Sequence, residues 1–397
     1  MFRLIILVIA LLDLVYWRWA DRRLRVVRPT RVWRGLLAAF VLFQLLILGT
    51  WFLSPTLLRT TQSHFPKPAV ASIFVWHLLV LPASMLVAAG PALARGVRRL
   101  VRGRRDPAAA PVPAPVSGLT RRDLLAATGA ALPPVLLCGG VAGALRQLDV
   151  LRVRRMQVAL PNVPPELDGL TITHLTDTHV GRFTDDRQMR KIVDACNALG
   201  SDLTLFTGDL IDYALADLPA ALDHAQRLDA RYGVAMCIGN HDMIESGDAF
   251  IEQTQTWGQI PLLLDGARTF TVRGRKVEVL GSKWNRSEHL RDNAIRDMLK
   301  RRDPEAMPIV LTHHPHGWDP AAAAGVPLTL AGHTHGGQIM LNERVGAGFI
   351  AFRYVSGLYR RNGTALVVSN GAGNWFPLRV NAPAEIIHIT VRAAASV

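Results

Sequence analysis

Cysteine and charged residues are both scarce in this chain of 397 residues, and each scarcity excludes a class of protein. The cysteines are Cys138, Cys196 and Cys237, which show neither a CxxC pair nor the spacing of a zinc site, so a disulfide-stapled framework is excluded. Charged residues make up only 19% of the chain and hydrophobic residues 50%. Because a disordered chain is poor in hydrophobic residues, this composition excludes disorder over most of the length.

Acidic residues are nearly absent from the first part of the chain. Residues 1–155 hold 22 Lys and Arg against 5 Asp and Glu, a net charge of +17. Residues 156–397 hold 23 against 26, a net charge of −3, which together with the first part gives the overall +14. The excess positive charge therefore lies in the N-terminal part, and the C-terminal part is not expected to be a basic nucleic-acid-binding domain.

Long uncharged stretches dominate this N-terminal part. Gly35–Leu58 and Pro68–Ala94 contain no charged residue, and each is long enough to cross the hydrocarbon core of a bilayer. Leu4–Val15, whose one charged residue is Asp13, predicts a shorter first span. We therefore expect a three-helix transmembrane module over residues 1–105.

Residues 106–150 lead from this module to the rest of the chain and allow two interpretations. Asp106–Gly118 is a Pro/Ala-rich linker, and Leu124–Leu145 is apolar but contains glycine and a Pro-Pro pair. This segment is either a fourth transmembrane helix or part of an export signal, because Thr120–Leu125 (TRRDLL) resembles a twin-arginine motif. In both cases the following domain leaves the cytoplasm.

The distribution of arginine predicts the same topology. Seven arginines lie in Arg18–Arg34 and eight in Arg95–Arg122, so these loops are expected on the cytoplasmic side. A fourth span then places residues from 150 onward on the extracytoplasmic side. Four arginines would then lie just outside the membrane and oppose this placement weakly, namely Arg146, Arg152, Arg154 and Arg155.

From residue 151 to 397 short apolar strands alternate with amphipathic helices, which is typical of a layered α/β domain. Polar residues follow five of the expected strands closely, namely Asp177, Asp209, Asn240, His313 and His333. Ligands of open α/β sheets bind outside the carboxyl ends of the strands. We therefore expect these five side chains to meet at one edge.

The motifs around these residues form a specific series: DTH from Asp177, GDLID from Gly208, GNHD from Gly239, HHP from His313 and GHTHGGQ from Gly332. This series resembles the calcineurin-like metallophosphoesterase superfamily, over residues 165–395. Two further segments, GLYR and VSNGAG, resemble a bacterial membrane-anchored or exported branch. The resemblance implies a four-layer αββα sandwich, here preceded by an all-α transmembrane module, and a bacterial inner membrane location.

The resemblance also implies a binuclear metal centre that hydrolyses phosphoester, phosphodiester or pyrophosphate bonds by a metal-bridging hydroxide. The implied ligands are Asp177, His179 and His335 for one ion, Asn240, His313 and His333 for the other, and Asp209 as the bridge. Carboxylate, amide and imidazole ligands suit two divalent ions of Mn, Fe, Zn or Co better than Ca. His241 is the implied catalytic residue, which stabilises phosphoryl oxygens or protonates the leaving group, while Asp212 and Asp242 support the ligands.

Functions from different classes remain open. The first is a membrane-anchored phosphoesterase acting on a phosphorylated small molecule or a lipid-linked substrate. The alternatives are a non-catalytic membrane sensor on the same fold and a nuclease-type phosphodiesterase. The presence of Asp209 and His241 argues against the sensor, and the net charge of −3 argues against the nuclease, so no nucleic-acid partner is expected.

Histidines and cations outside the motif positions are harder to assign. Lys283, Asn285 and Arg286 follow another expected strand and either contact phosphate or are exposed to solvent. His314 is expected to be a surface or core residue rather than a metal ligand.

Overall fold

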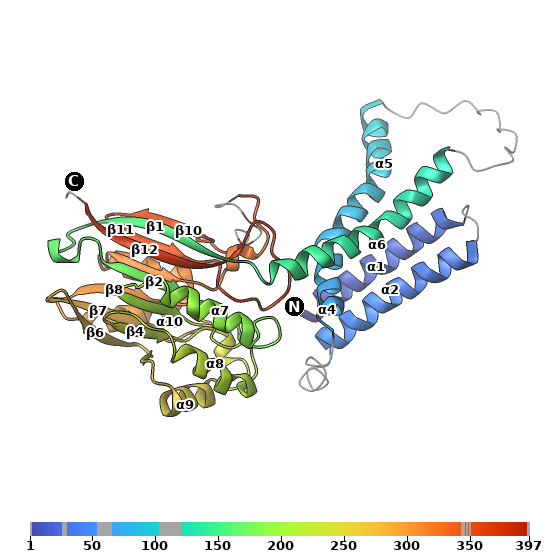
Figure 1. The fold of residues 1–397 in the computed structure, drawn as a ribbon. Helices are drawn as coiled ribbons and strands as arrows, with labels where there is room; N and C mark the ends of the chain where they lie inside the picture. Colours follow the sequence, from blue (N-terminus) through green and yellow to red (C-terminus); the bar gives the residue numbers. More distant parts are fainter. Residues whose placement is uncertain are drawn as a thin grey trace, which may run out of the picture. The chain divides into compact units, whose positions relative to one another are not determined.

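The computed structural model describes residues 2–25, 30–53, 66–102, 121–342, 346, 348 and 351–394. They form two compact units, Met1–Leu145 and Arg146–Val397. The first unit is helical and the second contains two sheets with helices around them (Figure 1). The predicted linker Asp106–Gly118 lies outside the described residues.

The N-terminal unit is built from long helices, one of them interrupted by a π-helical turn. They are α1 (Phe2–Leu24), α2 (Thr30–Leu53), α4 (Lys67–Val75), the π-turn η1 (Trp76–Val80), α5 (Leu81–Arg102) and α6 (Arg121–Gln147). The stretches Thr30–Thr50, Lys67–Gly90 and Ala127–Gln147 are long and apolar enough to cross a membrane. The charged residues in α1 set it apart from these stretches, and α6 continues through Pro133 and Pro134 as one helix.

A buried polar contact joins α1 to the π-turn. Asp13 is fully buried in the middle of α1, while apolar residues of the same helix such as Leu4 and Leu11 are exposed. The indole Nε1 of Trp76 donates to Asp13 Oδ1 at 2.7 Å, and Nε2 of His77 lies 2.9 Å from Asp13 Oδ2. The carboxylate thus faces the helix bundle and the apolar side chains face outward.

The His77 ring joins this contact to its own helix. Nδ1 of His77 is 2.9 Å from the carbonyl oxygen of Ile73, while Nε2 faces the carboxylate of Asp13. Both oxygens of the buried carboxylate thus have a partner. Such pairing reduces the cost of placing an ionisable residue in an apolar helix bundle.

Removal of one partner of this pair is expected to destabilise the N-terminal unit. His77→Ala leaves the buried carboxylate of Asp13 with a single donor, at a cost of about 3 kcal/mol. Thermal unfolding of the full chain in detergent measures the effect. The apolar double variant Asp13→Leu/His77→Leu should lose less stability than His77→Ala, and a larger loss in the double variant would contradict this account.

The C-terminal unit contains two sheets of six strands each. The first sheet has the order β1 (Leu151–Pro161), β12 (Ala384–Ala394), β2 (Thr171–Leu175), β3 (Leu203–Thr207), β4 (Gly233–Cys237) and β5 (Leu262–Leu263). The second has the order β10 (Gly357–Arg361), β11 (Thr364–Val368), β9 (Leu328–Ala331), β8 (Met307–Leu311), β7 (Arg275–Gly281) and β6 (Gly266–Val272).

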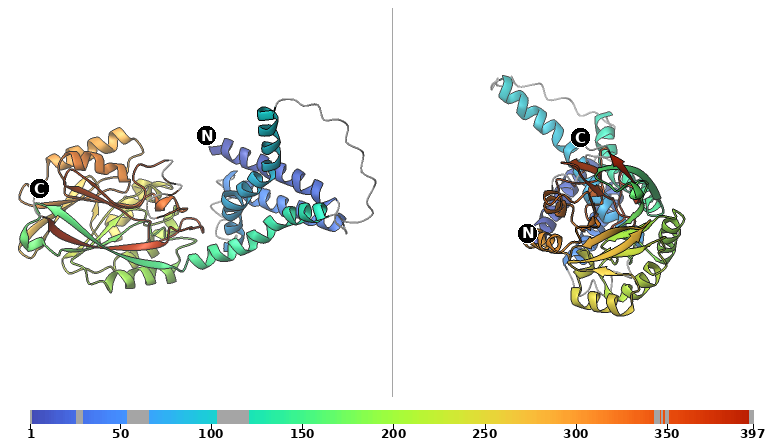
Figure 2. Two further views of the ribbon diagram at one scale, coloured as in Figure 1. Left: turned by 90° about the horizontal axis from the view of Figure 1, so that it is seen from above. Right: turned by 90° about the vertical axis from the view of Figure 1, so that its left-hand side faces the viewer.

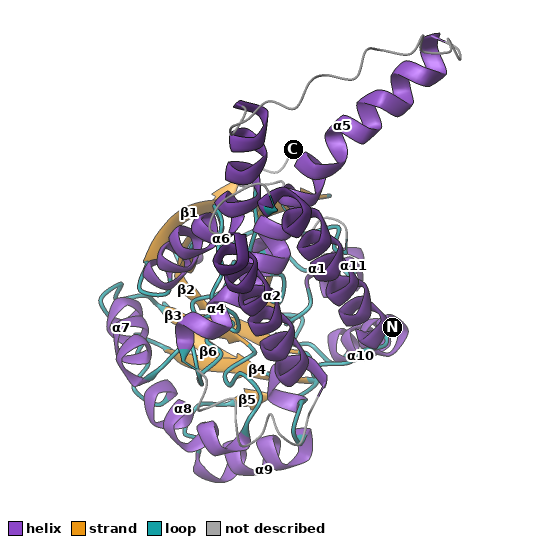
Figure 3. Cartoon of the chain, turned by 90° about the vertical axis from the view of Figure 1, so that its right-hand side faces the viewer, coloured by secondary structure: helices purple, strands orange, loops and turns teal. Residues whose placement is uncertain are grey.

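Helices cover the outer face of each sheet (Figure 3). The α-helices are α7 (Asp186–Asn197), α8 (Leu218–Ala225), α9 (Gly247–Trp257), α10 (Glu288–Lys300) and α11 (Trp318–Ala323). Short 3₁₀ turns are η2 (Pro165–Leu167), η3 (Leu215–Asp217), η4 (His241–Met243), η5 (Pro315–Gly317) and η6 (His335–Gly337).

Three buried apolar clusters establish the layers. The largest lies between the sheets and joins residues such as Leu205 of β3 to Ile309 of β8. A second packs α7, α8 and α9 onto the first sheet, and a third packs α10 and α11 onto the second sheet. The order is therefore helix, sheet, sheet, helix, which is the predicted αββα sandwich.

The first and last strands of the domain pair at one edge of the first sheet. β1 pairs in parallel with β12 along its whole length, so the first and last strands lie side by side (Figure 2). β1 is not predicted from the sequence, because its charged residues Arg152, Arg154 and Arg155 interrupt the apolar pattern. Charged side chains are common on edge strands, and Arg152 here binds Glu385 of β12 at 2.7 Å.

Candidate metal centre

The predicted ligands follow strands of both sheets. Asp177, Asp209 and Asn240 come after β2, β3 and β4 of the first sheet, and His313 and His333 come after β8 and β9 of the second. Strands β2, β3 and β4 pair in parallel, and so do β8 and β9, so their carboxyl ends share one edge within each sheet. The structure brings all the predicted ligands together there.

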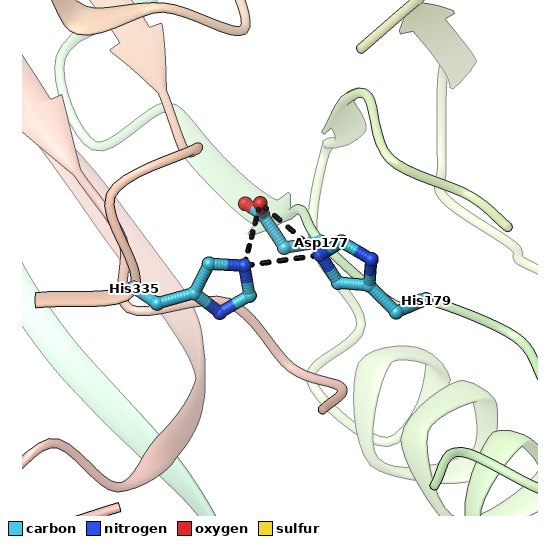
Figure 4. Close-up of side chains that lie close together, drawn as sticks. All are labelled: Asp177, His179 and His335. Carbon is cyan, nitrogen blue, oxygen red and sulfur yellow. Dashed lines mark hydrogen bonds and ion pairs between the residues drawn. The ribbon is translucent and has the colours of Figure 1, made fainter. Parts of the chain in front are cut away.

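One group of ligand atoms consists of Asp177, His179 and His335 (Figure 4). Nε2 of His179 lies 3.0 Å from Nε2 of His335, and Nε2 of His335 lies 3.1 Å from Asp177 Oδ1. All these side chains are buried. Two imidazole nitrogens and a carboxylate oxygen thus point at one another (Figure 4).

A second group consists of Asp209, His313 and His333, with Asn240 beside it. Nε2 of His313 lies 3.1 Å from Asp209 Oδ2 and 3.1 Å from Asn240 Oδ1. The same Oδ2 of Asp209 is 3.6 Å from Nε2 of His179 in the first group. Asp209 therefore touches both groups, as a bridging ligand must.

These spacings fit divalent cations. Ligands about 2.0–2.3 Å from one ion lie roughly 3–3.7 Å from each other. The separations of 3.0 and 3.1 Å in the first group and of 3.1 Å in the second fall in that interval. The donor set of carboxylates, imidazoles and one amide oxygen also suits such ions.

The charges inside the cluster favour cations as well. Burial alone lowers the pKa of His179, but the carboxylates of Asp177, Asp212 and Asp209 raise it to about 10. The pKa of His313 is likewise lowered by burial and raised by Asp209 and Asp177, to about 9. Burial instead lowers the pKa of His333 to about 3 and that of His335 to about 4, so these two rings are available as neutral ligands. At His179 and His313, metal ions would compete with protons for the same ligand atoms.

The backbone at the ligands is held in an uncommon conformation. Asp177, His179, Asp209, His333 and His335 all have positive φ, between 46° and 72°. Few residues other than glycine adopt this region, and those that do cluster at functional sites. At Asp177, Asp209 and His333 this conformation occurs just after β2, β3 and β9, where the chain leaves the sheet.

His241 lies beside the first group. Its Nδ1 donates to the carbonyl oxygen of Asp212 at 2.5 Å, so this nitrogen carries a proton. Its backbone N–H donates to Asp209 Oδ1 at 2.8 Å, and its ring lies 4.5 Å from that of His179. Asp212 Oδ1 lies 3.5 Å from Nδ1 of His179 and thus supports both histidines.

Asp242 fixes the loops that carry Asp209 and Asn240. Its buried carboxylate accepts the backbone N–H groups of Gly239, Asp209, Leu210 and Ile211 at 2.8 to 3.1 Å. Burial, and then the charge of Asp209, raises the pKa of Asp242 to about 6. This one side chain therefore links the loop that carries Asp209 to the loop that carries Asn240.

Two further residues reach the site, and neither is a candidate from the sequence alone. The indole of Trp284 lies 5.6 Å from the ring of His313 and 5.1 Å from that of His333. Buried Arg379 donates to the carbonyl oxygen of Asn370 at 3.0 Å and lies 3.3 Å from His335 Nδ1. No local motif marks either residue, because each contact joins segments distant in the sequence.

His314 lies near the site but in neither ligand group. Its ring lies 4.9 Å from that of His333 and lines the cavity beside the cluster.

Residues 170–337 match a family model described as calcineurin-like phosphoesterase. The C-terminal unit belongs to this family. Members of this family are phosphoester hydrolases that use divalent metals, and the groups of His and Asp described above could hold such ions.

Several relatives extend the match beyond this domain. An uncharacterized metallophosphoesterase of Bacillus subtilis is 27% identical over 284 residues, which cover 69% of this chain and 98% of that protein. A transmembrane protein with metallophosphoesterase domain of Danio rerio is 26% identical over 291 residues, 70% of this chain and 64% of its own length.

A third relative matches over a shorter region. UDP-2,3-diacylglucosamine pyrophosphatase LpxG of Chlamydia trachomatis is 35% identical over 95 residues, 24% of this chain and 29% of that protein. The match thus spans less than two thirds of the zebrafish and chlamydial proteins. Together with the apolar helices, the relatives named as transmembrane proteins support membrane association.

Proposed function

We propose that this chain is a membrane-anchored phosphoesterase with two divalent cations of Mn, Fe, Zn or Co, and that it cleaves a phosphodiester, pyrophosphate or other phosphoester bond in a lipid-linked substrate. The observation that carries the proposal is the pair of ligand groups joined by Asp209. Asp177, His179 and His335 would hold one ion, and Asn240, His313 and His333 the other.

When bound, such ions polarise a phosphoryl oxygen and lower the pKa of a coordinated water. The chain's own residues position the reacting groups. Asp212 and Asp242 orient the ligand side chains and loops. His241 is placed to stabilise the phosphoryl oxygens or to protonate the leaving oxygen through Nε2.

Loss of the bridge should abolish both metal binding and hydrolysis. Asp209→Asn removes the anionic oxygen that the two groups share. Loss of a residue that only orients ligands lowers activity by up to about 100-fold. Because Asp209 would itself be a ligand, the activity of this variant on bis(p-nitrophenyl) phosphate should fall further than that. The measurement uses the full chain in detergent, with metal content determined on the same sample.

The matched control for this variant is Asp194→Asn, on the exposed face of α7, which should keep both activity and metal. Full activity and unchanged metal content in Asp209→Asn would refute the proposed centre.

The role of His241 predicts a dependence on the leaving group. General acid catalysis contributes about 10²–10⁴-fold where the leaving oxygen needs a proton. His241→Ala should therefore lose that factor on alkyl phosphodiesters and much less on p-nitrophenyl esters, whose leaving group departs as an anion. Measured kcat values for both substrates test this, and equal losses would contradict the acid role.

One objection to the proposed extracytoplasmic location of the catalytic domain, the arginines at the start of the domain, is weakened by their contacts. Arg152 binds Glu385 within the folded domain, and Arg154 lies 3.9 Å from the same carboxylate. Both arginines thus interact within the folded domain. They therefore count less against an extracytoplasmic placement than unpaired arginines beside the membrane would.

A reporter at the C-terminus tests this topology. Alkaline phosphatase, which is active only outside the cytoplasm, should give a strong signal when fused after Val397, whereas a fusion in the Arg95–Arg122 loop should be inactive. The reverse pattern would overturn the proposed placement.

A further inference from the structure

A cavity of about 930 Å³ opens beside the second ligand group. Asn240 and His333 form one end of its wall, so a molecule in the cavity borders the proposed metal centre. Ions held at that centre would bind one phosphate, and the cavity is large enough for the remainder of an extended substrate. The other residues that line the cavity therefore indicate which chemical groups the rest of the substrate carries.

Cations without protein partners line this cavity. The side chains of Lys283 and Arg286 make no hydrogen bond or ion pair with any described residue. Asp265 and Glu288 also line the wall, but each contacts another group: Asp265 accepts the backbone N–H of Lys283 at 2.8 Å, and Glu288 lies 3.2 Å from Nδ1 of His316. The side chains of Lys283 and Arg286 pair with neither carboxylate and can bind an anion from outside the protein.

The backbone that carries these cations is fixed in place. It follows β7, which pairs in parallel with β8, so it leaves the sheet at the same edge as His313. The N–H of Ser282 donates to the carbonyl oxygen of Leu311 at 2.9 Å. Trp284, between the two cations in sequence, packs against the rings of His313 and His333. The loop therefore holds Lys283 and Arg286 beside the proposed metal centre.

Apolar side chains complete the wall. Met243, Ile244 and Trp284 line the cavity, and Ile244 is 55% exposed although it is a large hydrophobic residue. Cations next to an apolar surface favour an amphiphilic ligand in which an anionic group adjoins a hydrocarbon group.

We propose that Lys283 and Arg286 bind the second phosphate of a diphosphate-linked amphiphile, whose apolar group packs on Met243, Ile244 and Trp284. This inference rests on the proposed function and adds the class of substrate. Water adds its oxygen to the phosphorus at the metal centre, the bond from that phosphorus to the bridging oxygen breaks, and the two protons of water end on the two monophosphate products.

The test compares substrates with one and two phosphates. Bis(p-nitrophenyl) phosphate and a dialkyl diphosphate are given to the full chain in detergent, wild type and Lys283→Ala/Arg286→Ala. The double variant should raise KM for the dialkyl diphosphate at least tenfold and leave kcat/KM for the aryl ester within twofold. High salt should raise the wild-type KM for the diphosphate, because salt screens the exposed cations.

The matched control is Arg296→Ala/Lys300→Ala, which removes two exposed cations of α10 outside the cavity and should change neither substrate. Equal losses on both substrates, or no loss on the diphosphate, would overturn the inference while leaving the phosphoesterase intact. The inference would also be overturned if the wild type cleaved the aryl ester but not the diphosphate. A wild type that cleaves neither would overturn both proposals.

Discussion

The carboxylate of Asp209 is the contact on which the rest of the site depends. Its Oδ2 lies 3.1 Å from His313, delivered by the second sheet, and 3.6 Å from His179, delivered by the first. Its Oδ1 accepts the N–H of His241, and its own N–H donates to Asp242. The two sheets, the general-acid candidate and the supporting carboxylate therefore all meet at one residue.

This arrangement requires an unusual backbone and a dense local charge. Positive φ at Asp209 and at Asp177 turns the chain sharply at the end of each strand, and Gly208 beside Asp209 also has positive φ. Buried carboxylates without cations would be costly. Protonated histidines offset them in the protein alone, and metal ions would do so more effectively, because each carries two charges.

The sequence predicts the layers and the gathered residues well, because each ligand closely follows a short apolar strand. It does not predict β1, whose arginines pair with Glu385 only when the last strand lies beside it. It also does not predict that Trp284 packs on His313 and His333, since that contact depends on the parallel pairing of β7 with β8. Contacts between segments that are distant in the sequence are therefore the features that the sequence alone does not predict.

The most direct test of the central claim is the electron paramagnetic resonance spectrum of the full chain loaded with Mn²⁺. If Asp209 bridges two ions, the wild type should bind two Mn²⁺ per chain and show an exchange-coupled spectrum, which Asp209→Asn should lose. A spectrum of isolated Mn²⁺, with one ion bound per wild-type chain, would contradict the account.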